Sequence, residues 1–282
     1  MYIPMVPDSS TRWLAPAKLN LFLHITSRRA DGYHNLQTIF QFIDYSDILC
    51  FNTRPDGQLS CVSTAKNLPP EQDLVLRAAR LLKQYSGTSL GADIQVEKKL
   101  PMGGGLGGGS SDAATTLLAL NQLWQLQLPS ATLAQLGLRL GADVPVFVHG
   151  HAAWAEGVGD SLTPVDLEEP WYLVIHPGCH VSTAKIFSAD DLTRDAFCIT
   201  IRDFLAGHSQ NVCEPVVRRR YRAVGQALDW LNQYRQARLT GTGACLFAAF
   251  ESQAAANAVL AELPSMWHGF VAQGKIISPA LN

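Results

Sequence analysis

A glycine-rich loop that leads into a helix is the segment of the sequence that most clearly predicts chemistry. Six of the seven residues from 103 to 109 are glycines, and two serines and a helix-forming segment follow. Glycine lets the backbone adopt positive φ angles and approach a ligand without an intervening side chain. Successive N–H groups in such a loop, with the N-terminus of the next helix, bind anions such as a di- or triphosphate. The residues that we expect to hold phosphates are Pro101, Met102, Gly103, Gly104, Gly105, Leu106, Gly107, Gly108, Gly109, Ser110 and Ser111.

This loop fits three common glycine motifs poorly. The pattern Gly103-x-Gly105-x-x-Gly108 matches the dinucleotide-binding motif, but a run so rich in glycine matches almost any glycine pattern. The acidic residue expected about 20 positions later would also fall near a helix rather than at a strand end. A Walker A loop would end in Gly-Lys-Ser/Thr, whereas Gly109 is followed directly by Ser110. The HRD and DFG motifs of protein kinases do not follow in the sequence. A flexible linker is the structural alternative.

Phosphoryl transfer at a loop without its own lysine needs positive charge from elsewhere, through Mg²⁺ and a lysine distant in sequence. Lys18 is the natural candidate because it lies in an apolar, strand-like segment, where a charge is costly unless it is used. Its alternative role is that of a surface lysine whose head reaches solvent. Asp143 stands between Gly141 and an apolar segment, where it could orient a substrate hydroxyl or accept its proton. An aspartate that caps a turn is the alternative.

The elements that must position these residues follow from the apolar periodicity. Strands are expected at 13–25, from the Asp-Gly turn near 30 to 51, at 92–96, 144–148 and 171–176, and as a pair within 238–250 around a second glycine turn. Helices are expected at 74–85, 111–124, 131–140, 213–234 and 254–263. Thr132 is expected to cap the helix at 131–140, and Gly141 is expected to end it. The irregular order favours an α+β fold with a domain boundary near 155–165.

Composition excludes several classes of protein. The 282 residues carry 22 Lys and Arg against 24 Asp and Glu, a net charge of −2, which does not suit a surface that grips nucleic acid or an anionic membrane. The N-terminal residues lack the basic and apolar regions of a signal peptide, and no apolar run approaches the length of a membrane span. The six cysteines are scattered singly, which is typical of reduced thiols in a cytoplasmic protein.

Three segments together resemble the GHMP kinase superfamily. They are residues 16–21 (PAKLNL), the loop at 101–114 (PMGGGLGGGSSDAA) and the turn at 239–245 (LTGTGAC). This resemblance implies a two-domain α+β fold with the active site in the inter-domain cleft. The expected division is an N-terminal ATP-binding domain over 1–160 and a C-terminal domain over 161–282.

Two further segments, 29–34 (RADGYH) and 141–148 (GADVPVFV), narrow the resemblance to the kinases of 4-diphosphocytidyl-2-C-methyl-D-erythritol. It implies Mg-dependent transfer of the γ-phosphate of ATP to the 2-hydroxyl of that substrate, in the non-mevalonate isoprenoid pathway. Asp143 is then the base and Lys18 its partner. The nucleotide side includes Asp73, where the family commonly has Asn, and Lys98. The residues expected to recognise the substrate are Asn20, Tyr33, His34, Thr183 and Phe187.

Tyr33 and Phe187 are flat side chains suited to sandwiching a cytosine ring, and His34 can hydrogen-bond its edge. The protein is expected to be a monomer or a weak homodimer with no nucleic-acid or membrane partner. A GHMP kinase of another alcohol, such as mevalonate or homoserine, is the first alternative. A non-catalytic ATP-binding protein and a dinucleotide-dependent oxidoreductase are the others.

Overall fold

The computed structural model describes residues 12–64 and 69–281. The N-terminal residues 1–11, in which the sequence predicts no signal peptide, lie outside the described residues. Strands and helices alternate irregularly along the chain, which confirms the predicted α+β class. The strands are β1 (Arg12–Arg28), β2 (His34–Arg54), β3 (Leu59–Ser63), β4 (Gly91–Glu97), β5 (Ala153–Glu156), β6 (Ser161–Pro164), β7 (Trp171–His176), β8 (Arg238–Leu239), β9 (Leu246–Phe250) and β10 (His268–Lys275). The helices are α1 (Leu74–Ser86), α2 (Gly108–Leu123), α3 (Ser130–Leu138), α4 (Val144–His149), α5 (Thr183–Phe187), α6 (Ile201–Leu205), α7 (Glu214–Arg220), α8 (Arg222–Leu231), α9 (Gln253–Ala261) and the 3₁₀ helix η2 (Pro279–Leu281).

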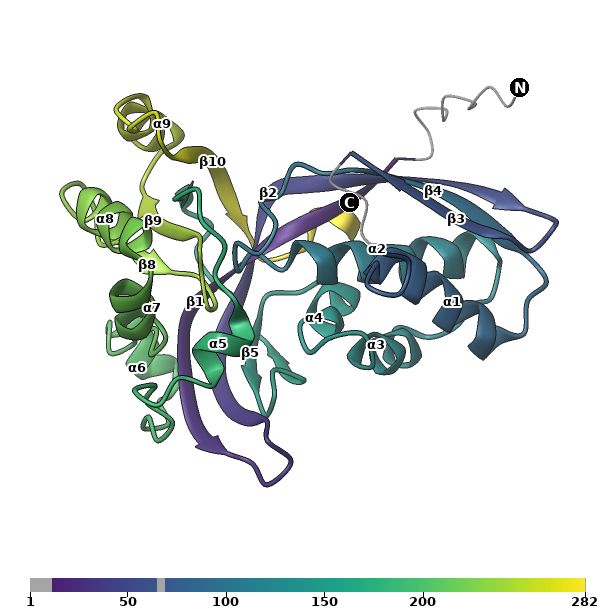
Figure 1. Ribbon diagram of the computed structural model, residues 1–282, viewed down its shortest axis with the longest axis horizontal. Coiled ribbons are helices and arrows are strands. Elements are labelled where there is room, and N and C mark those ends of the chain that lie inside the picture. Colours follow the sequence, from purple (N-terminus) through teal and green to yellow (C-terminus); the bar gives the residue numbers. More distant parts are fainter. Residues whose placement is uncertain (1–11, 65–68, 282) are drawn as a thin grey trace.

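A long antiparallel hairpin of β1 and β2 runs through the middle of the molecule (Figure 1). Its register extends from Arg12 opposite Cys50 to Arg28 opposite His34, with a shift between Asn20 and Leu23. Residues 15–25 of β1 include no exposed position, because other elements cover both faces of the hairpin over that stretch. Strands covered on both sides carry continuous apolar runs rather than alternating ones. This buried stretch is where Lys18 and Asn20 lie.

Strand β10 joins the two halves of the sheet. The strand order is β3-β4-β2-β10-β7-β9-β8, with β1 and β5 also paired to β2, and β6 paired to β5. Strand β10 pairs with β7 over residues 268–273 and then with β2 through Gly274 and Lys275. The C-terminal strands therefore hold a fixed position against the hairpin, and side chains from both halves can meet in one site.

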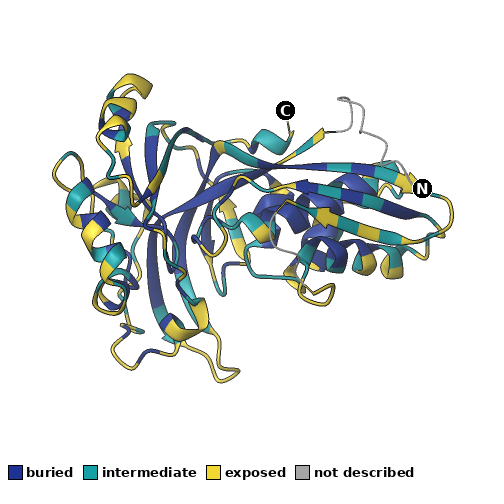
Figure 2. Cartoon of the chain, turned by 45° about the horizontal axis from the view of Figure 1, so that its top comes forward, coloured by how far each residue is buried: buried dark blue, intermediate teal, exposed yellow. Residues whose placement is uncertain are grey.

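Helices cover the two halves separately. Helices α1 to α4 pack on the β1–β2–β4 part of the sheet, and helices α7 to α9 pack on β7, β8 and β9 (Figure 1). A third apolar cluster between them contains Leu19, Phe22, Leu106 and Phe247, which come from both ends of the chain. The buried positions accordingly form a continuous band along the long strands (Figure 2).

One predicted strand is a helix. Residues 144–148 form most of α4, which extends from Val144 to His149 and ends at Gly150 in the left-handed conformation. Pro145 lies in the first turn, where a missing N–H costs no intrahelical hydrogen bond and the fixed φ angle suits a helix. A short apolar run fits a buried helix as well as a strand, and the prediction of an edge strand was wrong here.

Three further boundaries differ from the sequence prediction. Helix α3 begins at Ser130 after Pro129, so Thr132 lies inside the helix and is not its cap. The segment predicted as one helix over 213–234 is two helices that meet at Tyr221. Helix α2 begins at Gly108, three residues before the predicted start, so the end of the glycine loop is already helical.

Candidate active site

The two halves of the molecule enclose a cavity of about 600 Å³ along the glycine loop. Strands β1 and β2, the starts of α1 and α2, helix α5 and the turn at Gly241–Thr242 all contribute to its lining. Its volume is in the range of small-molecule sites, and so many converging elements are typical of a site between domains. The predicted site residues that line this cavity are Lys18, Asn20, Asp73, Lys98, residues 101–110, Asp143, Thr183 and Phe187. Ser111, Tyr33 and His34 do not line it.

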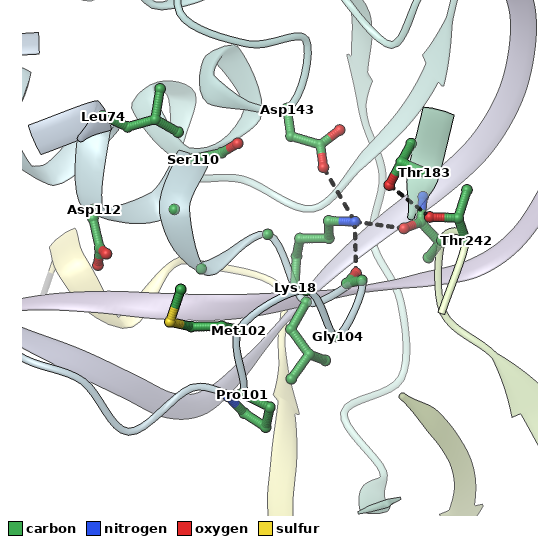
Figure 3. Close-up of a pocket in the computed structure, with 18 of the residues that line it drawn as sticks. Lys18, Leu74, Pro101, Met102, Gly104, Ser110, Asp112, Asp143, Thr183 and Thr242 are labelled. Atoms are coloured by element: carbon green, nitrogen blue, oxygen red, sulfur yellow. Dashed lines mark hydrogen bonds and ion pairs between the residues drawn. The ribbon is translucent and has the colours of Figure 1, made fainter. Parts of the chain in front are cut away.

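Lys18 is almost fully buried on β1, with 3% of its side chain exposed. Its Nζ atom lies 2.5 Å from Oδ1 of Asn20, 3.0 Å from the carbonyl oxygen of Gly105 and 3.3 Å from Oδ2 of Asp143 (Figure 3). An ammonium group has three N–H donors, and this one donates hydrogen bonds to Asn20 and Gly105 and forms an ion pair with Asp143. The cation predicted from the apolar strand is therefore buried, paired and fixed in direction.

Asp143 precedes the first residue of α4 without capping that helix through its side chain. Its carboxylate instead forms the ion pair with Lys18, and 35% of the side chain is exposed to the cavity. Asp73 shows the contrasting role, because its Oδ1 accepts hydrogen bonds from the backbone N–H groups of Val75 and Leu76 at the start of α1. Of these two aspartates, Asp143 is the one whose carboxylate is available to a ligand.

The glycine loop requires glycine at the positions nearest to Lys18. Gly105 and Gly107 have φ angles of 77° and 74°, which L-residues with a side chain rarely adopt. A Cβ atom on Gly107 would lie 2.8 Å from Cζ of Phe147 and 3.1 Å from Cε of Lys18. No side chain caps α2, which begins directly after Gly107, so the N–H groups of its first turn are left for a ligand. This cradle fits the phosphates of a nucleotide.

The second glycine turn, between β8 and β9, lies against the first loop. The backbone N–H groups of Ala244 and Cys245 donate to the carbonyl oxygens of Gly103 and Gly104, at 3.3 and 3.0 Å. Its Thr242 hydroxyl lies 2.9 Å from that of Thr183 at the start of α5. The turn therefore holds the phosphate loop in place from the C-terminal half and extends towards the substrate side.

A buried charge cluster supports the other end of the loop. Lys98 pairs with Asp47 and, at 2.7 Å, with Oδ2 of Asp112. Burial, and then the charge of Asp47, raise the pKa of Asp112 to about 7 despite the neighbouring lysine. Burial opposes the charge on Lys98, but the two carboxylates outweigh it and raise the pKa of this lysine. The sequence prediction of Lys98 did not include its partners: Asp47 has no motif of its own, and Asp112 lies within the glycine-loop segment without having been singled out.

Comparison with known proteins extends these observations. The family models for the GHMP kinases N terminal domain and the GHMP kinases C terminal domain match residues 73–151 and 199–269. A protein of Alkalilimnicola ehrlichii named 4-diphosphocytidyl-2-C-methyl-D-erythritol kinase is 59% identical over 273 residues, covering 97% of this chain and 94% of its own. One of the same name from Nitrosococcus oceani is 58% identical over 262 residues, with 93% and 94% covered.

The chain belongs to the 4-diphosphocytidyl-2-C-methyl-D-erythritol kinase family of GHMP kinases.

Solved structures agree with this membership. A crystal structure of 4-(cytidine 5'-diphospho)-2C-methyl-D-erythritol kinase superposes with a TM-score of 0.81 at 30% identity, over 93% of this chain and 98% of that one. The mevalonate kinase of Methanococcus jannaschii has a TM-score of 0.70 at 16% identity, over 96% and 100%, which shows the shared fold alone. The chain is an ATP-dependent small-molecule kinase of the GHMP fold, as the sequence predicts.

In this GHMP kinase the departure at Asp73 has a local explanation. Asn and Asp are both favoured at helix N-caps, because either side-chain oxygen can accept from the first free N–H groups. Asp73 keeps this cap for α1 and also lines the cavity. Its expected contact with adenine stays a prediction.

The residues expected to recognise the substrate of the kinase lie in two positions. Thr183 and Phe187 line the cavity from α5, and the rings of Phe187 and His34 are 5.2 Å apart. Burial, and then the charges of Arg194 and Arg28, lower the pKa of His34. Nε2 of His34 accepts from Nε of Arg194 at 3.3 Å, which places the ring proton on Nδ1. Tyr33 is 65% exposed beside this pair.

Of the two serines that follow the glycines, Ser110 lines the cavity and Ser111 is buried outside it. Among the described residues there is no group of three side chains arranged to hold a metal. Mg²⁺ that arrives with a nucleotide needs only one or two protein oxygens beside phosphate and water. The hydroxyl of Ser110 and the carboxylate of Asp143 both face the same cavity and fit that requirement.

Proposed function

We propose that this kinase transfers the γ-phosphoryl group of ATP to the 2-hydroxyl of 4-diphosphocytidyl-2-C-methyl-D-erythritol, in the non-mevalonate isoprenoid pathway. The observation that carries the chemistry is the ion pair of Lys18 and Asp143 beside the glycine loop. The substrate is inferred from relatives of that name, at 58 and 59% identity over nearly the whole chain.

In the proposed reaction, Asp143 accepts the proton of the substrate hydroxyl while that oxygen forms a bond to the γ-phosphorus. The bond from phosphorus to the oxygen of the β-phosphate breaks, and ADP leaves with that oxygen. Asp143 suits this role because its carboxylate is exposed to the cavity and makes no cap hydrogen bond. Lys18 orients the carboxylate and places a positive charge beside the transferred group.

The glycine loop and the start of α2 would hold the phosphates of ATP through backbone N–H groups. Ser110 and Asp143 would hold a Mg²⁺ ion that arrives with the nucleotide, and the ion would supply positive charge beside the phosphates. Lys98 and Asp73, which both line the cavity, would lie at its nucleotide side, as the family resemblance implies. On the other side, Tyr33, His34 and Phe187 would hold the cytosine ring, and Asn20 and Thr183 would lie near the sugar alcohol.

We infer further that the protein works in the cytoplasm as a monomer or weak homodimer, with domains dividing near residue 160. Its cysteines at the described positions are all free thiols, and no described helix is long and apolar enough to cross a bilayer. The arginines of α7 are paired with acidic groups, as Arg219 is with Asp191 at 2.6 Å, which argues against a nucleic-acid patch. The proposed domain boundary divides the sequence but does not separate the cores completely, since Leu23 and Ile25 from the N-terminal part pack with the C-terminal core.

An assay of ADP release with Mg-ATP tests the proposed function. 4-Diphosphocytidyl-2-C-methyl-D-erythritol is supplied in parallel with mevalonate and homoserine, and we expect turnover with the cytidylyl substrate alone. Turnover with one of the other alcohols would keep the chemistry and discard the substrate. ATP binding without turnover of any of them would favour the non-catalytic alternative.

A further inference from the structure

A chain of hydrogen bonds leads from Lys18 through Asn20 to a residue outside the predicted site, Thr38. Nδ2 of Asn20 donates to Oγ1 of Thr38 at 2.9 Å, and the Thr38 hydroxyl donates to the carbonyl oxygen of Phe22. Thr38 lies on β2, is 0% exposed and carries no charge. It also lines the cavity, beside Asn20 and Lys18.

The direction of each hydrogen bond in this chain is fixed by the carbonyl of Phe22. A carbonyl oxygen can only accept, so the single proton of the Thr38 hydroxyl must point to it. Only lone pairs of Thr38 then remain for Asn20, and the amide must present its NH₂ group to Thr38. Consequently Oδ1 of Asn20 faces the opposite way, towards Nζ of Lys18.

The same chain closes an irregularity in the β1–β2 hairpin. The register shifts between Asn20 and Leu23, and Phe22 lies inside this bulge, where it has no partner residue in the ladder. Bulges of this kind redirect side chains and are common beside active sites. Thr38 therefore satisfies the carbonyl group that the bulge leaves free and uses it to orient the amide.

On the other side, the backbone N–H of Asn20 donates to Oγ1 of Thr240 at 3.0 Å. The main chain of Asn20 is thus held by Thr240 and its side chain by Thr38. With the amide oxygen of Asn20 aimed at Lys18, the ammonium group donates two hydrogen bonds to acceptors fixed by the protein interior, and its Nζ lies 3.3 Å from Oδ2 of Asp143.

We propose that Thr38 is a positioning residue for phosphoryl transfer, which fixes the Asn20 amide so that the Lys18 ammonium group stays beside Asp143. This inference rests on the proposed function for its reaction. Without the Thr38 hydroxyl, the Asn20 amide is free to turn its NH₂ group towards the Lys18 ammonium. The two donors then repel, and Lys18 moves away from Asp143.

The test compares Thr38→Val, which replaces the hydroxyl by a methyl group, with Thr38→Ser, which keeps it. We expect kcat to fall about 10- to 100-fold in Thr38→Val, because small displacements of catalytic groups have effects of that size. KM for ATP stays within about twofold of wild type, since the phosphate loop is unchanged. Thr38→Ser is expected to restore most of the activity. Thr38→Ala is measured beside Thr38→Val, since it removes the same hydroxyl without requiring space for a second methyl group.

Thr116→Val is the matched control. Thr116 is also 0% exposed, and its hydroxyl donates to the carbonyl oxygen of Asp112 inside α2. This variant loses a buried hydroxyl and a comparable amount of stability, and its kcat should stay at the wild-type value. A fall in kcat equal to that of Thr38→Val would assign the effect to general destabilisation and overturn the proposal.

A double-mutant cycle with Asn20→Leu separates a path through Asn20 from an independent effect. If Thr38 acts through Asn20, Thr38→Val causes no further loss of kcat in the Asn20→Leu background. Additive losses, or a kcat for Thr38→Val within about twofold of wild type, would overturn the inference. All variants are assayed with the alcohol that the wild-type enzyme phosphorylates fastest. A wild type that prefers another alcohol therefore contradicts only the proposed substrate, whereas an unaltered Thr38→Val contradicts only the role of Thr38.

Discussion

Lys18 and Asp143 form an ion pair with unequal surroundings: Nζ and Oδ2 are 3.3 Å apart, while 3% of the lysine and 35% of the aspartate side chain are exposed. The lysine comes from the buried hairpin strand β1, and the aspartate from the start of α4. The buried partner is held by Asn20 and Gly105, and the aspartate is the more exposed of the two to the cavity. This asymmetry favours a fixed cation and an accessible base.

The phosphate loop is expected to tolerate no side chain at Gly107. In Gly107→Ala the new Cβ would crowd Phe147 and Lys18 at a φ of 74°, and the loop must shift. We predict that kcat/KM for ATP falls at least about tenfold, because the phosphates lose their alignment. Gly225→Ala, within α8 and with its Cβ 3.6 Å from the carbonyl oxygen of Arg218, should keep wild-type kinetics. Equal kinetic parameters for Gly107→Ala and wild type would show that this position does not shape the phosphate site.

The buried cluster around Lys98 predicts a dependence of stability on pH. The pKa of Asp112 rises from 3.8 to about 7 on folding, so the folded protein binds more protons than the unfolded chain between these values. Stability from this group is therefore present at low pH and is lost as the pH rises towards 7. Asp112→Asn removes the titrating carboxyl, so the free energy of unfolding of the variant relative to wild type should increase from pH 5 to pH 8.

Urea unfolding at several pH values measures this difference. One pKa unit corresponds to about 1.4 kcal/mol, and we expect a relative gain of at least about 1 kcal/mol for Asp112→Asn at pH 8 over pH 5. A difference between the two proteins that is constant across this range would mean that Asp112 is ionised in the folded protein throughout.

The exposed ring of Tyr33 is expected to bind the base of the substrate. Stacking of a base on an aromatic side chain contributes about 1–3 kcal/mol, so Tyr33→Leu should raise KM for the cytidylyl substrate about 5- to 100-fold. KM for ATP should be unchanged, and Tyr33→Phe, which keeps the ring, should resemble wild type. Tyr85→Leu removes a similarly exposed tyrosine, on α1, as a control. An unchanged KM in Tyr33→Leu would remove this residue from base recognition.

Much of the fold could be predicted from the sequence, because long apolar runs and glycine turns are local signals. The strand at Trp171–His176 and the helix at Leu74–Ser86 are examples with nearly the predicted bounds. Helix α4 could not be predicted, because its six residues are too few to show a helical period, and Pro145 is compatible with both structures. The pairing of β10 with both halves depends on contacts between distant segments.

In the candidate site too, some residues could be predicted from local sequence and others only from contacts between distant segments. The glycine loop, Lys18 and Asp143 have recognisable sequence contexts, and the structure brings them together. Thr38 lacks such a signal, because its role depends on a bulge in the opposite strand. The pairing of Asp47 and Asp112 with Lys98 is also recognisable only in the folded protein. For both Thr38 and Asp47, the clue in the sequence is a polar residue within a largely apolar strand, and both residues are buried in the structure.

The most direct test of the account is the turnover of Asp143→Asn with Mg-ATP and 4-diphosphocytidyl-2-C-methyl-D-erythritol. This variant keeps the size of the side chain and an oxygen for Lys18, but its amide cannot take the substrate proton. We predict that kcat falls at least about 100-fold, in line with the loss of a general base, while the Kd for ATP measured by calorimetry stays near that of wild type. A kcat close to wild type would contradict the assignment of Asp143 as the base and, with it, the proposed mechanism.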